Sequence, residues 1–332
     1  MSNSTHESRV PGPGSRVPAP SESRLAFVFP GQGSQSVGML GTLAEVQPEV
    51  RETFAEASAA VGFDLWALSQ DGPEAELNRT ENTQPALLAA GVAVWRCWLA
   101  RGGTQPALMA GHSLGEYTAL VCAGAMSLAD AARLVQTRGR LMQAAVSEGQ
   151  GAMAAVLGAE DALVEQVCAE VAGDEVVQPA NYNSPGQIVI AGHAGAVDRA
   201  LAALGERGVR KTVKLAVSVP SHCALMREAA DALAEALEAA RISMPEIAII
   251  HNVTAQISSD LASLRQALAA QLHQPVRWTA CVQALAVAGV GRIAECGPGK
   301  VLTGLVKRID RGLEARALGG PDELAAAFEA WA

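Results

Sequence analysis

The sequence predicts an α/β protein in which a parallel-sheet core is interrupted by a smaller inserted unit. Short apolar segments alternate with helical patterns along most of the chain, which is typical of a parallel sheet covered by helices. Between residues 151 and 219 the order becomes strand, helix, strand, strand, helix, strand, which is the order of a ferredoxin-like unit. With 332 residues, 49% of them hydrophobic, the chain can bury a large core.

The first part of the chain predicts a tail followed by a strand and two long helical patterns. Residues 1–23 are rich in Ser and Pro and contain SRVPGP and SRVPAP, so we expect a disordered tail. The fold is expected to begin near Arg24, where LAFVFP predicts a buried strand that runs into the loop PGQGSQ. Helical patterns follow at about 52–70 and 84–101. PALMA then predicts a short strand, GHSLGEY a turn and TALVCAGAM a helix.

The second part of the chain predicts the insert and the return to the core. The insert comprises the strands GAMAAVLG, VVQPANYN, GQIVIAG and VRKTVKLAVSV and the helices DALVEQVCAEVA and AVDRALAALGERG. The alternation resumes with a helix at 222–240, the strand EIAIIHN, helices through 285, the strand RIAEC and helices from Lys300 and Pro321. The predicted units are a tail at 1–23, a large catalytic α/β domain at 24–148 and 219–332, and an insert at 149–218, with a cleft between the two folded units.

Charge and cysteine usage exclude several classes of protein. A formal net charge of -9 argues against a nucleic-acid binder, which needs a basic surface to neutralise phosphates. The six cysteines form no C-x-x-C pair and no Cys/His group at zinc spacing, so we expect reduced, mostly buried thiols and no metal site. No segment approaches about 18 uninterrupted apolar residues, and the N-terminus lacks the apolar region of a secretory signal. We therefore expect a cytoplasmic protein without a membrane span.

The stretch GHSLGEY contains the pattern G-x-S-x-G around Ser113. The pattern is short and arises by chance, so alone it predicts either a nucleophile or a turn residue with glycine neighbours. Its context favours a nucleophile, because a predicted strand precedes it and a predicted helix follows it. A serine hydroxyl also needs a base to take its proton and donors aimed at the oxyanion.

His222 is the candidate base by its position. It follows the strand and proline of VSVPS, and we expect it at the first turn of a helix capped by Ser221. The positive end of the helix dipole would disfavour the imidazolium and keep His222 able to accept a proton. The alternative is a packed or capping histidine, and His112, beside the serine, is expected to support the turn.

Arg138 lies on the apolar face of a predicted helix. In SLADAARLVQTRGRLMQAA, where Ser127 and Asp130 predict a cap, the apolar positions recur at spacings of three and four, and Arg138 continues that stripe. Arg133 and Arg140 fall on the opposite, solvated side. An inward guanidinium needs an anion, which is either a buried carboxylate of the protein or the carboxylate of a ligand.

Two loops follow predicted strands, the usual place for ligands in open parallel sheets. Gln32 in PGQGSQ could supply an oxyanion donor. That loop lacks the third glycine of a dinucleotide fingerprint, and GPGK at 297–300 lacks the residues of a phosphate-binding loop. Simple turns are the alternative interpretation of both loops.

Several longer motifs occur together and in order: FVFPGQGSQ, GHSLGEY, QTRG, NYNSPGQIVIAG, VPSHCALM, QLHQPVRW and ECGPGKVLTGLVKRI. From Arg24 onward the chain resembles the malonyl-CoA:acyl carrier protein transacylases, a bacterial acyltransferase family. The resemblance implies an α/β-hydrolase-like core with a ferredoxin-like insert, in agreement with the element order above. It also implies transfer of a malonyl group from malonyl-CoA to the phosphopantetheine thiol of acyl carrier protein through a malonyl-serine intermediate.

The resemblance implies roles for five residues of the catalytic machinery. Ser113 would be the nucleophile and His222 its base. Gln271, in QLHQPVRW, would orient His222. Gln32 and the backbone N–H of Leu114 would form the oxyanion hole.

The resemblance also implies residues that bind the substrate. Arg138 would grip the free malonyl carboxylate, while Asn181 and Asn183 would line the cleft. His273 and Gln274 depart from the family, in which an aromatic residue and Asn are more common at these positions. This departure concerns local contacts and no catalytic role.

Fatty-acid and polyketide synthesis use similar transacylases, and the sequence does not separate the two pathways. Alternative interpretations are a trans-acting acyltransferase of a polyketide pathway, a serine thioesterase or acyl hydrolase of the same fold, and a scaffold that only docks carrier protein. A hydrolase of neutral esters has no use for Arg138. The expected partners are malonyl-CoA and acyl carrier protein, with no nucleic acid, no membrane and no cofactor or metal, and the expected oligomeric state is a monomer.

Overall fold

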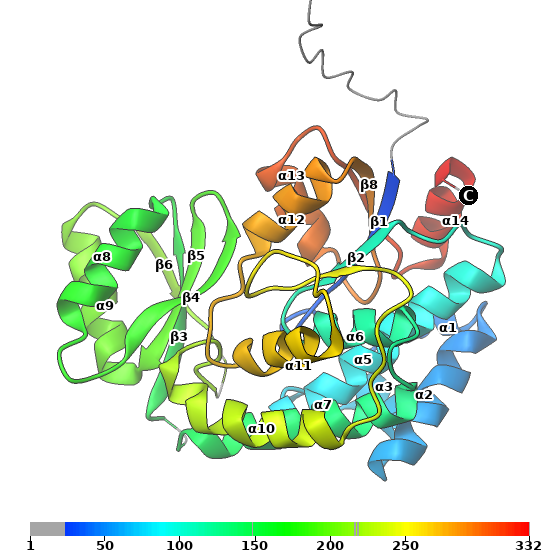
Figure 1. The fold of residues 1–332 in the computed structure, drawn as a ribbon, viewed down its shortest axis with the longest axis horizontal. Helices are drawn as coiled ribbons and strands as arrows, with labels where there is room; N and C mark the ends of the chain where they lie inside the picture. Colours follow the sequence, from blue (N-terminus) through cyan, green and yellow to red (C-terminus); the bar gives the residue numbers. More distant parts are fainter. Residues whose placement is uncertain (1–23, 148, 216, 218, 332) are drawn as a thin grey trace, which may run out of the picture.

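The computed structural model describes residues 24–331 except 148, 216 and 218, so the tail expected at 1–23 lies outside the described residues. Its core is a five-stranded sheet with the strand order β7-β2-β1-β8-β9, in which all neighbouring strands are parallel (Figure 1). The strands are β1 (Arg24–Phe29), β2 (Leu108–Gly111), β7 (Ile249–Ile250), β8 (Val290–Glu295) and β9 (Glu314–Ala317).

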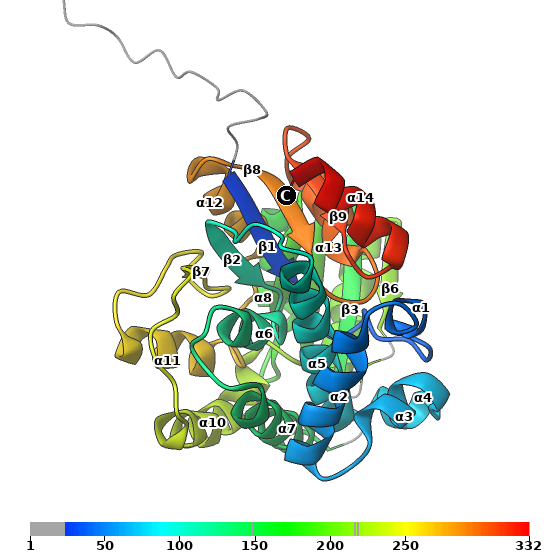
Figure 2. The ribbon, with the colours of Figure 1, turned by 90° about the vertical axis from the view of Figure 1, so that its right-hand side faces the viewer.

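Helices cover both faces of this sheet because its strands are apolar on both sides. In β1, Leu25, Phe27 and Phe29 pack into one buried cluster, while Ala26 and Val28 pack into a second cluster on the other face. Figure 2 shows α6 (Gly115–Cys122) next to the sheet, with α5 (Thr80–Ala100), α2 (Pro48–Val61) and α7 (Leu128–Ala145) stacked on the same side.

The first cluster includes side chains of α1 (Gly41–Ala44), α2 (Pro48–Val61), α3 (Leu65–Asp71), α4 (Glu74–Leu77), α5 (Thr80–Ala100), α6 (Gly115–Cys122), α7 (Leu128–Ala145), α10 (Arg227–Ala239), α11 (Leu261–Ala270) and α14 (Pro321–Trp331). The second cluster includes side chains of α12 (Trp278–Val287) and α13 (Val301–Ile309).

The insert is a four-stranded antiparallel sheet with two helices, drawn in green to one side of the main sheet in Figure 1. Its strand order is β4-β5-β3-β6, and helices α8 and α9 close a separate apolar cluster against it. The predicted fold class, a parallel core with a ferredoxin-like insert, is therefore confirmed. The elements are β3 (Gly151–Leu157), α8 (Asp161–Val171), β4 (Val177–Ser184), β5 (Gln187–His193), α9 (Ala194–Glu206) and β6 (Lys211–Lys214).

Several predicted elements differ in extent from those observed. The helix expected at 52–70 is two helices, because Gly62 adopts φ 83° and ends α2. The strands expected from EIAIIHN and VRKTVKLAVSV are shorter, and β9 was not predicted. Its four residues, EARA, show too little apolar pattern to stand out, and their pairing with β8 is what makes them a strand.

The structure confirms the expectation of buried thiols. All six cysteines are free and buried. Among the residues described, none of the helices combines the length and the apolar character that a bilayer span requires.

Candidate active site

Ser113 lies on a sharp turn between β2 and α6, in the strand-turn-helix order that the sequence predicts. Its φ is 52°, in the left-handed region that residues other than glycine rarely adopt. The two glycines of the motif allow this turn. A Cβ on Gly111 would lie 1.9 Å from the carbonyl carbon of Gly115, and a Cβ on Gly115 would lie 2.0 Å from the carbonyl oxygen of Phe29. The backbone therefore packs too closely for any other residue at either position.

We expect Gly115→Ala to lower the free energy of unfolding by more than about 3 kcal/mol, because the new methyl group overlaps backbone that has no room to move. Urea unfolding followed by circular dichroism measures the change. The control is Gly205→Ala in α9, where a Cβ meets nothing within 4 Å and alanine favours the helix. If Gly115→Ala lowered the free energy of unfolding no more than Gly205→Ala does, the close packing described at this turn would be contradicted.

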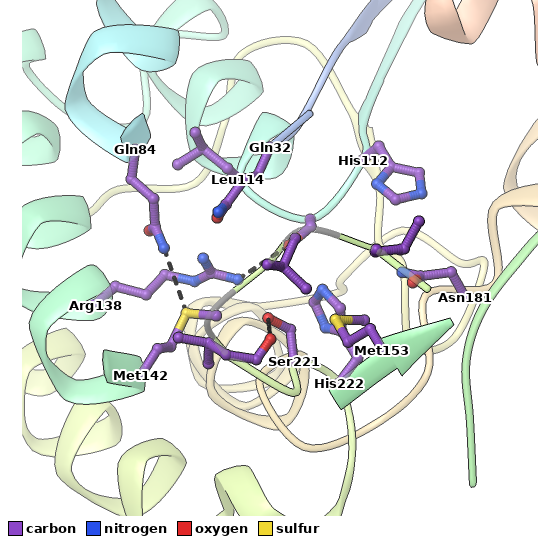
Figure 3. A pocket seen from close by; sticks show the side chains of 14 residues that line it. Gln32, Gln84, His112, Leu114, Arg138, Met142, Met153, Asn181, Ser221 and His222 are labelled. Carbon is purple, nitrogen blue, oxygen red and sulfur yellow. Dashed lines mark hydrogen bonds between the residues drawn. The ribbon is translucent and has the colours of Figure 1, made fainter. Parts of the chain in front are cut away.

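His222 is buried, with 3% of its surface exposed, and lines the same pocket as Ser113 (Figure 3). Its Nδ1 lies 2.6 Å from the backbone carbonyl oxygen of Gln271 and donates to it. The proton is thereby held on Nδ1, which leaves Nε2 as the nitrogen that can accept a proton. Burial, followed by the positive charge of Arg138, lowers the pKa of His222 to about 3.

The expected surroundings of His222 are wrong in one respect. Ser221 does not cap a helix: its hydroxyl contacts the Val219 carbonyl at 3.5 Å, and α10 begins at Arg227 after a short 3-10 turn. His222 instead adopts φ 63°, and its N–H donates to the Leu272 carbonyl at 2.9 Å. Its neutral state therefore results from burial and from Arg138, and not from a helix dipole.

Arg138 faces inward from α7, as its place in the apolar stripe predicts. Only 1% of its surface is exposed, whereas Arg133 and Arg140 are exposed and pair with Asp130 and Glu81. Ser127 caps this helix by accepting from the Asp130 N–H, as expected. The predicted burial of Arg138 is confirmed.

The buried guanidinium contacts the serine directly. Arg138 Nη2 donates to Ser113 Oγ at 3.2 Å and to Gln271 Oε1 at 3.0 Å, and its Nε has no partner in the described part of the chain. The ring of Tyr117 lies 5.4 Å from the guanidinium carbon. No carboxylate among the described residues lies within 4.0 Å of Arg138, which favours a ligand carboxylate over a structural ion pair.

Ser113 and His222 make no hydrogen bond to each other among the described residues, and the serine oxygen accepts from Arg138. Catalytic hydrogen bonds are often formed only when substrate is present. The pocket thus brings nucleophile, base and cation together before any ligand binds.

Gln271 acts through its main chain and its side chain. Its backbone carbonyl orients His222, which agrees with the implied role, while its side chain contacts Arg138 and the Ser113 carbonyl. It does not line the pocket and lies behind it, fully buried at the end of α11.

The residues expected at the oxyanion hole and cleft lie at this site. Leu114 is the N-cap residue of α6, and Gln32 contacts Thr80 at 3.5 Å; both line the pocket. Asn181 lines it from β4. Asn183 accepts from His112 Nε2 at 2.9 Å and lines only the adjoining pocket.

Two neighbouring pockets share part of their lining, and Ser113 lines one of them. The serine pocket, of about 100 Å³, has the polar lining residues Gln32, Gln84, Ser113, Arg138, Asn181 and His222. Its apolar wall includes Met142, Met153, Leu215, Val217 and Val219. The adjoining pocket, of about 180 Å³, shares Gln32, His112, Asn181 and Leu215 with it and extends to α13.

Sequence reasoning missed several residues of this site. Gln84 and Met142 face Arg138's pocket, and the Gln84 amide contacts the Met142 sulfur at 3.3 Å (Figure 3). Glu116, His251 and Asn252 form a buried network beneath the turn. The only signal for Glu116 was its place in GHSLGEY, and Gln84 and Asn252 carried none.

Comparisons with known proteins agree on one family. A family model described as an acyl transferase domain matches residues 26–315. A malonyl CoA-acyl carrier protein transacylase of Salmonella typhimurium is 57% identical over 306 residues, which are 92% of this chain and 99% of that protein. The transacylase of Bacillus subtilis is 42% identical over 92% of this chain and 97% of its own length.

Solved structures give the same result. A malonyl-CoA:acyl carrier protein transacylase from Xanthomonas oryzae superposes with a TM-score of 0.93 at 66% identity, covering 94% of this chain and 99% of that one. A malonyl-transacylase in complex with a type II PKS acyl-carrier protein superposes with a TM-score of 0.92 at 53% identity, covering 93% and 100%. This chain belongs to the acyl transferase domain family.

Proposed function

We propose that this chain is a malonyl-CoA:acyl carrier protein transacylase. The observation that carries the proposal is the contact between Ser113 Oγ and Arg138 Nη2, 3.2 Å apart in one small pocket. A nucleophile and a buried cation at this separation suit an acyl group that ends in a carboxylate. The names of relatives more than 50% identical over nearly the whole chain support malonyl as that group.

The first half of the reaction loads the serine. Ser113 Oγ attacks the thioester carbon of malonyl-CoA while His222 Nε2 takes the hydroxyl proton. The Leu114 N–H, at the start of α6, and the Gln32 amide donate to the developing oxyanion. The C–S bond then breaks, His222 returns its proton to the CoA sulfur, and malonyl-Ser113 remains.

The second half transfers the acyl group. The phosphopantetheine thiol of acyl carrier protein gives its proton to His222 and attacks the malonyl-Ser113 ester. The ester C–O bond breaks, and His222 returns the proton to Ser113 Oγ. These steps use only side chains and backbone donors of this chain, so the proposed reaction needs no cofactor or metal.

The adjoining pocket would hold the pantetheine arm in both halves. It shares Gln32, His112 and Asn181 with the serine pocket and continues along apolar residues of α13. Donor and acceptor carry the same arm, so one pocket serves both. The side chains of Asn181 and Asn183 can bond to the amides of that arm.

The proposal includes the cellular setting. Six free, buried cysteines agree with a reducing cytoplasm, and we further propose a monomer. Sedimentation equilibrium tests the monomer.

The complex of a related malonyl-transacylase with a type II PKS carrier protein supports a role in polyketide synthesis beside fatty-acid synthesis.

The low pKa of His222 predicts a flat acid side of the pH profile. His222 must be neutral to act as base, and its pKa of about 3 keeps it neutral well below 6.5. We expect kcat/KM for malonyl-CoA, measured in rapid-quench assays, to stay constant from about pH 8 to about pH 5. A fall with a midpoint near the ordinary histidine pKa would contradict this environment.

The same pKa lowers stability in acid, so folding needs a control. Between the unfolded pKa near 6.5 and the folded value of about 3, the unfolded state binds the His222 proton and the folded state does not. The free energy of unfolding therefore falls as pH falls through this window. Circular dichroism at each pH must show folded enzyme before a rate is interpreted.

The proposed function is tested by loading followed by transfer. Enzyme is mixed with equal amounts of malonyl-CoA and acetyl-CoA, its intact mass is recorded, and holo acyl carrier protein is then added. We expect a malonyl adduct in preference to acetyl, stable until the carrier protein removes it. Release of free malonate without an acceptor would favour the hydrolase interpretation, and the absence of any adduct would favour a scaffold.

A further inference from the structure

A buried carboxylate lies directly beneath the active-site turn. Glu116, in the first turn of α6, has no exposed surface. Its Oε1 contacts His251 Nδ1 at 2.6 Å, and its Oε2 accepts from the Asn252 N–H at 3.2 Å and from Gln271 Nε2. Three segments distant in the sequence thus converge on one side chain that the proposed mechanism does not use.

The network determines which way the Gln271 amide points. Its Nε2 faces three acceptors, which are Glu116 Oε2, the Ser113 carbonyl at 3.0 Å and Asn252 Oδ1 at 3.3 Å. Its Oε1 is thereby left to accept from Arg138 Nη2 at 3.0 Å. Turning the amide over would set an NH2 group against the guanidinium and an oxygen against a carboxylate.

Asn252 has a separate task in this network. Its Nδ2 donates to the Gly111 carbonyl at 2.6 Å, and its Oδ1 accepts from the Ser113 N–H at 2.7 Å. Asn252 therefore braces the turn itself. The branch from Glu116 through Gln271 leads instead to Arg138, the residue that selects the acyl group.

We propose that Glu116 is a positioning residue for acyl selectivity: its carboxylate fixes the direction of the Gln271 amide, and Gln271 in turn holds Arg138 against the serine pocket. This inference rests on the proposed function, because the carboxylate that Arg138 selects is that of the malonyl group. Glu116 touches no substrate, and in this role it acts through Gln271. Because no carboxylate among the described residues pairs with Arg138, this indirect hold decides where its charge lies.

The test is a double-variant cycle on selectivity. Glu116→Met, Gln271→Met and the double variant keep the volume of the side chains and remove their polar groups. The readout is kcat/KM for malonyl-CoA divided by that for acetyl-CoA, each measured for loading of Ser113. Loss of folded enzyme lowers both values equally, so the ratio responds to Arg138 and not to stability.

We expect each single variant to lower this ratio about tenfold, the usual worth of one charge-assisted hydrogen bond. We expect the double variant to lower it no further, because both changes break the same branch. Gln271→Met keeps the backbone carbonyl that orients His222, so this variant removes only the contacts of the side chain.

Two further variants separate positioning from stability. Glu116→Gln keeps an oxygen for Gln271 and Asn252 and can donate to His251 Nδ1 once that ring carries its proton on Nε2, so it should restore the ratio. Glu295→Met removes another fully buried carboxylate, which accepts from backbone N–H groups of α13, and should leave the ratio unchanged.

The outcomes are distinct. If the wild-type enzyme showed no preference for malonyl-CoA over acetyl-CoA, the proposed function itself would be contradicted. A wild-type enzyme with that preference, together with an unchanged ratio in Glu116→Met, would overturn the role of Glu116 alone. If Glu116→Met does not fold, an unchanged ratio in Gln271→Met overturns it equally, because Glu116 acts through that amide.

Discussion

Ser113→Ala is expected to abolish the malonyl adduct and to lower transfer to acyl carrier protein by at least about 10³-fold. The serine oxygen forms the covalent intermediate, and it contacts Arg138 in the serine pocket. Water cannot replace it, because transfer needs an acyl group that stays on the enzyme until the carrier protein arrives. Intact mass after incubation with malonyl-CoA gives the adduct, and carrier-protein mass gives the transfer.

The variant should remain folded, which makes the loss of activity interpretable. Alanine and serine are equally strained at φ 52°, so the substitution adds no conformational strain to the folded state. Ser58→Ala, in α2 and away from both pockets, serves as a matched serine control. A malonyl adduct that persisted in Ser113→Ala would refute the assignment of the nucleophile.

Arg138→Ala is expected to remove the preference for malonyl. Truncation of one partner of a buried charge pair costs about 2–5 kcal/mol, so kcat/KM for malonyl-CoA should fall by about 30-fold to about 4,000-fold. Acetyl-CoA makes no such pair, and in the native enzyme it leaves the guanidinium buried without an anion. Loading of Ser113 from acetyl-CoA should therefore stay unchanged or become faster. Competition between malonyl-CoA and acetyl-CoA measures the change in preference.

Arg133→Ala supplies the control for this experiment. Arg133 lies on the same helix but is exposed and pairs with Asp130, so its loss changes the charge of the protein equally without touching the pocket. Its malonyl preference should match that of the native enzyme. Equal effects of the two variants would show that net charge, and not a specific contact, determines the preference.

Local patterns in the sequence predicted most of the fold and the direction of one key side chain. The spacing of apolar residues in α7 places Arg138 inward, because helical geometry alone decides which face a residue occupies. The strand-turn-helix order around Ser113 and the element order of the insert are likewise local properties. The resemblance of the longer motifs to the transacylase family then indicated that Ser113, His222 and Arg138 belong to one site.

What the sequence did not predict depends on contacts between distant segments. The surroundings of His222 are set by Gln271 and Leu272, which lie about fifty residues further along, and no local pattern shows that a backbone carbonyl rather than a helix end orients the ring. The burial of Glu116 depends in the same way on His251 and Asn252. Hydrogen bonds between distant segments produce no periodic spacing of residues that could be recognised in the sequence.

The most direct test of the account is a crystal structure of the enzyme loaded with a malonyl group. We expect an ester on Ser113 Oγ, its carbonyl oxygen facing the Leu114 N–H, and the free carboxylate hydrogen-bonded to the Arg138 guanidinium. A malonyl group whose carboxylate turns into the adjoining pocket, with Arg138 left on its present partners, would contradict it.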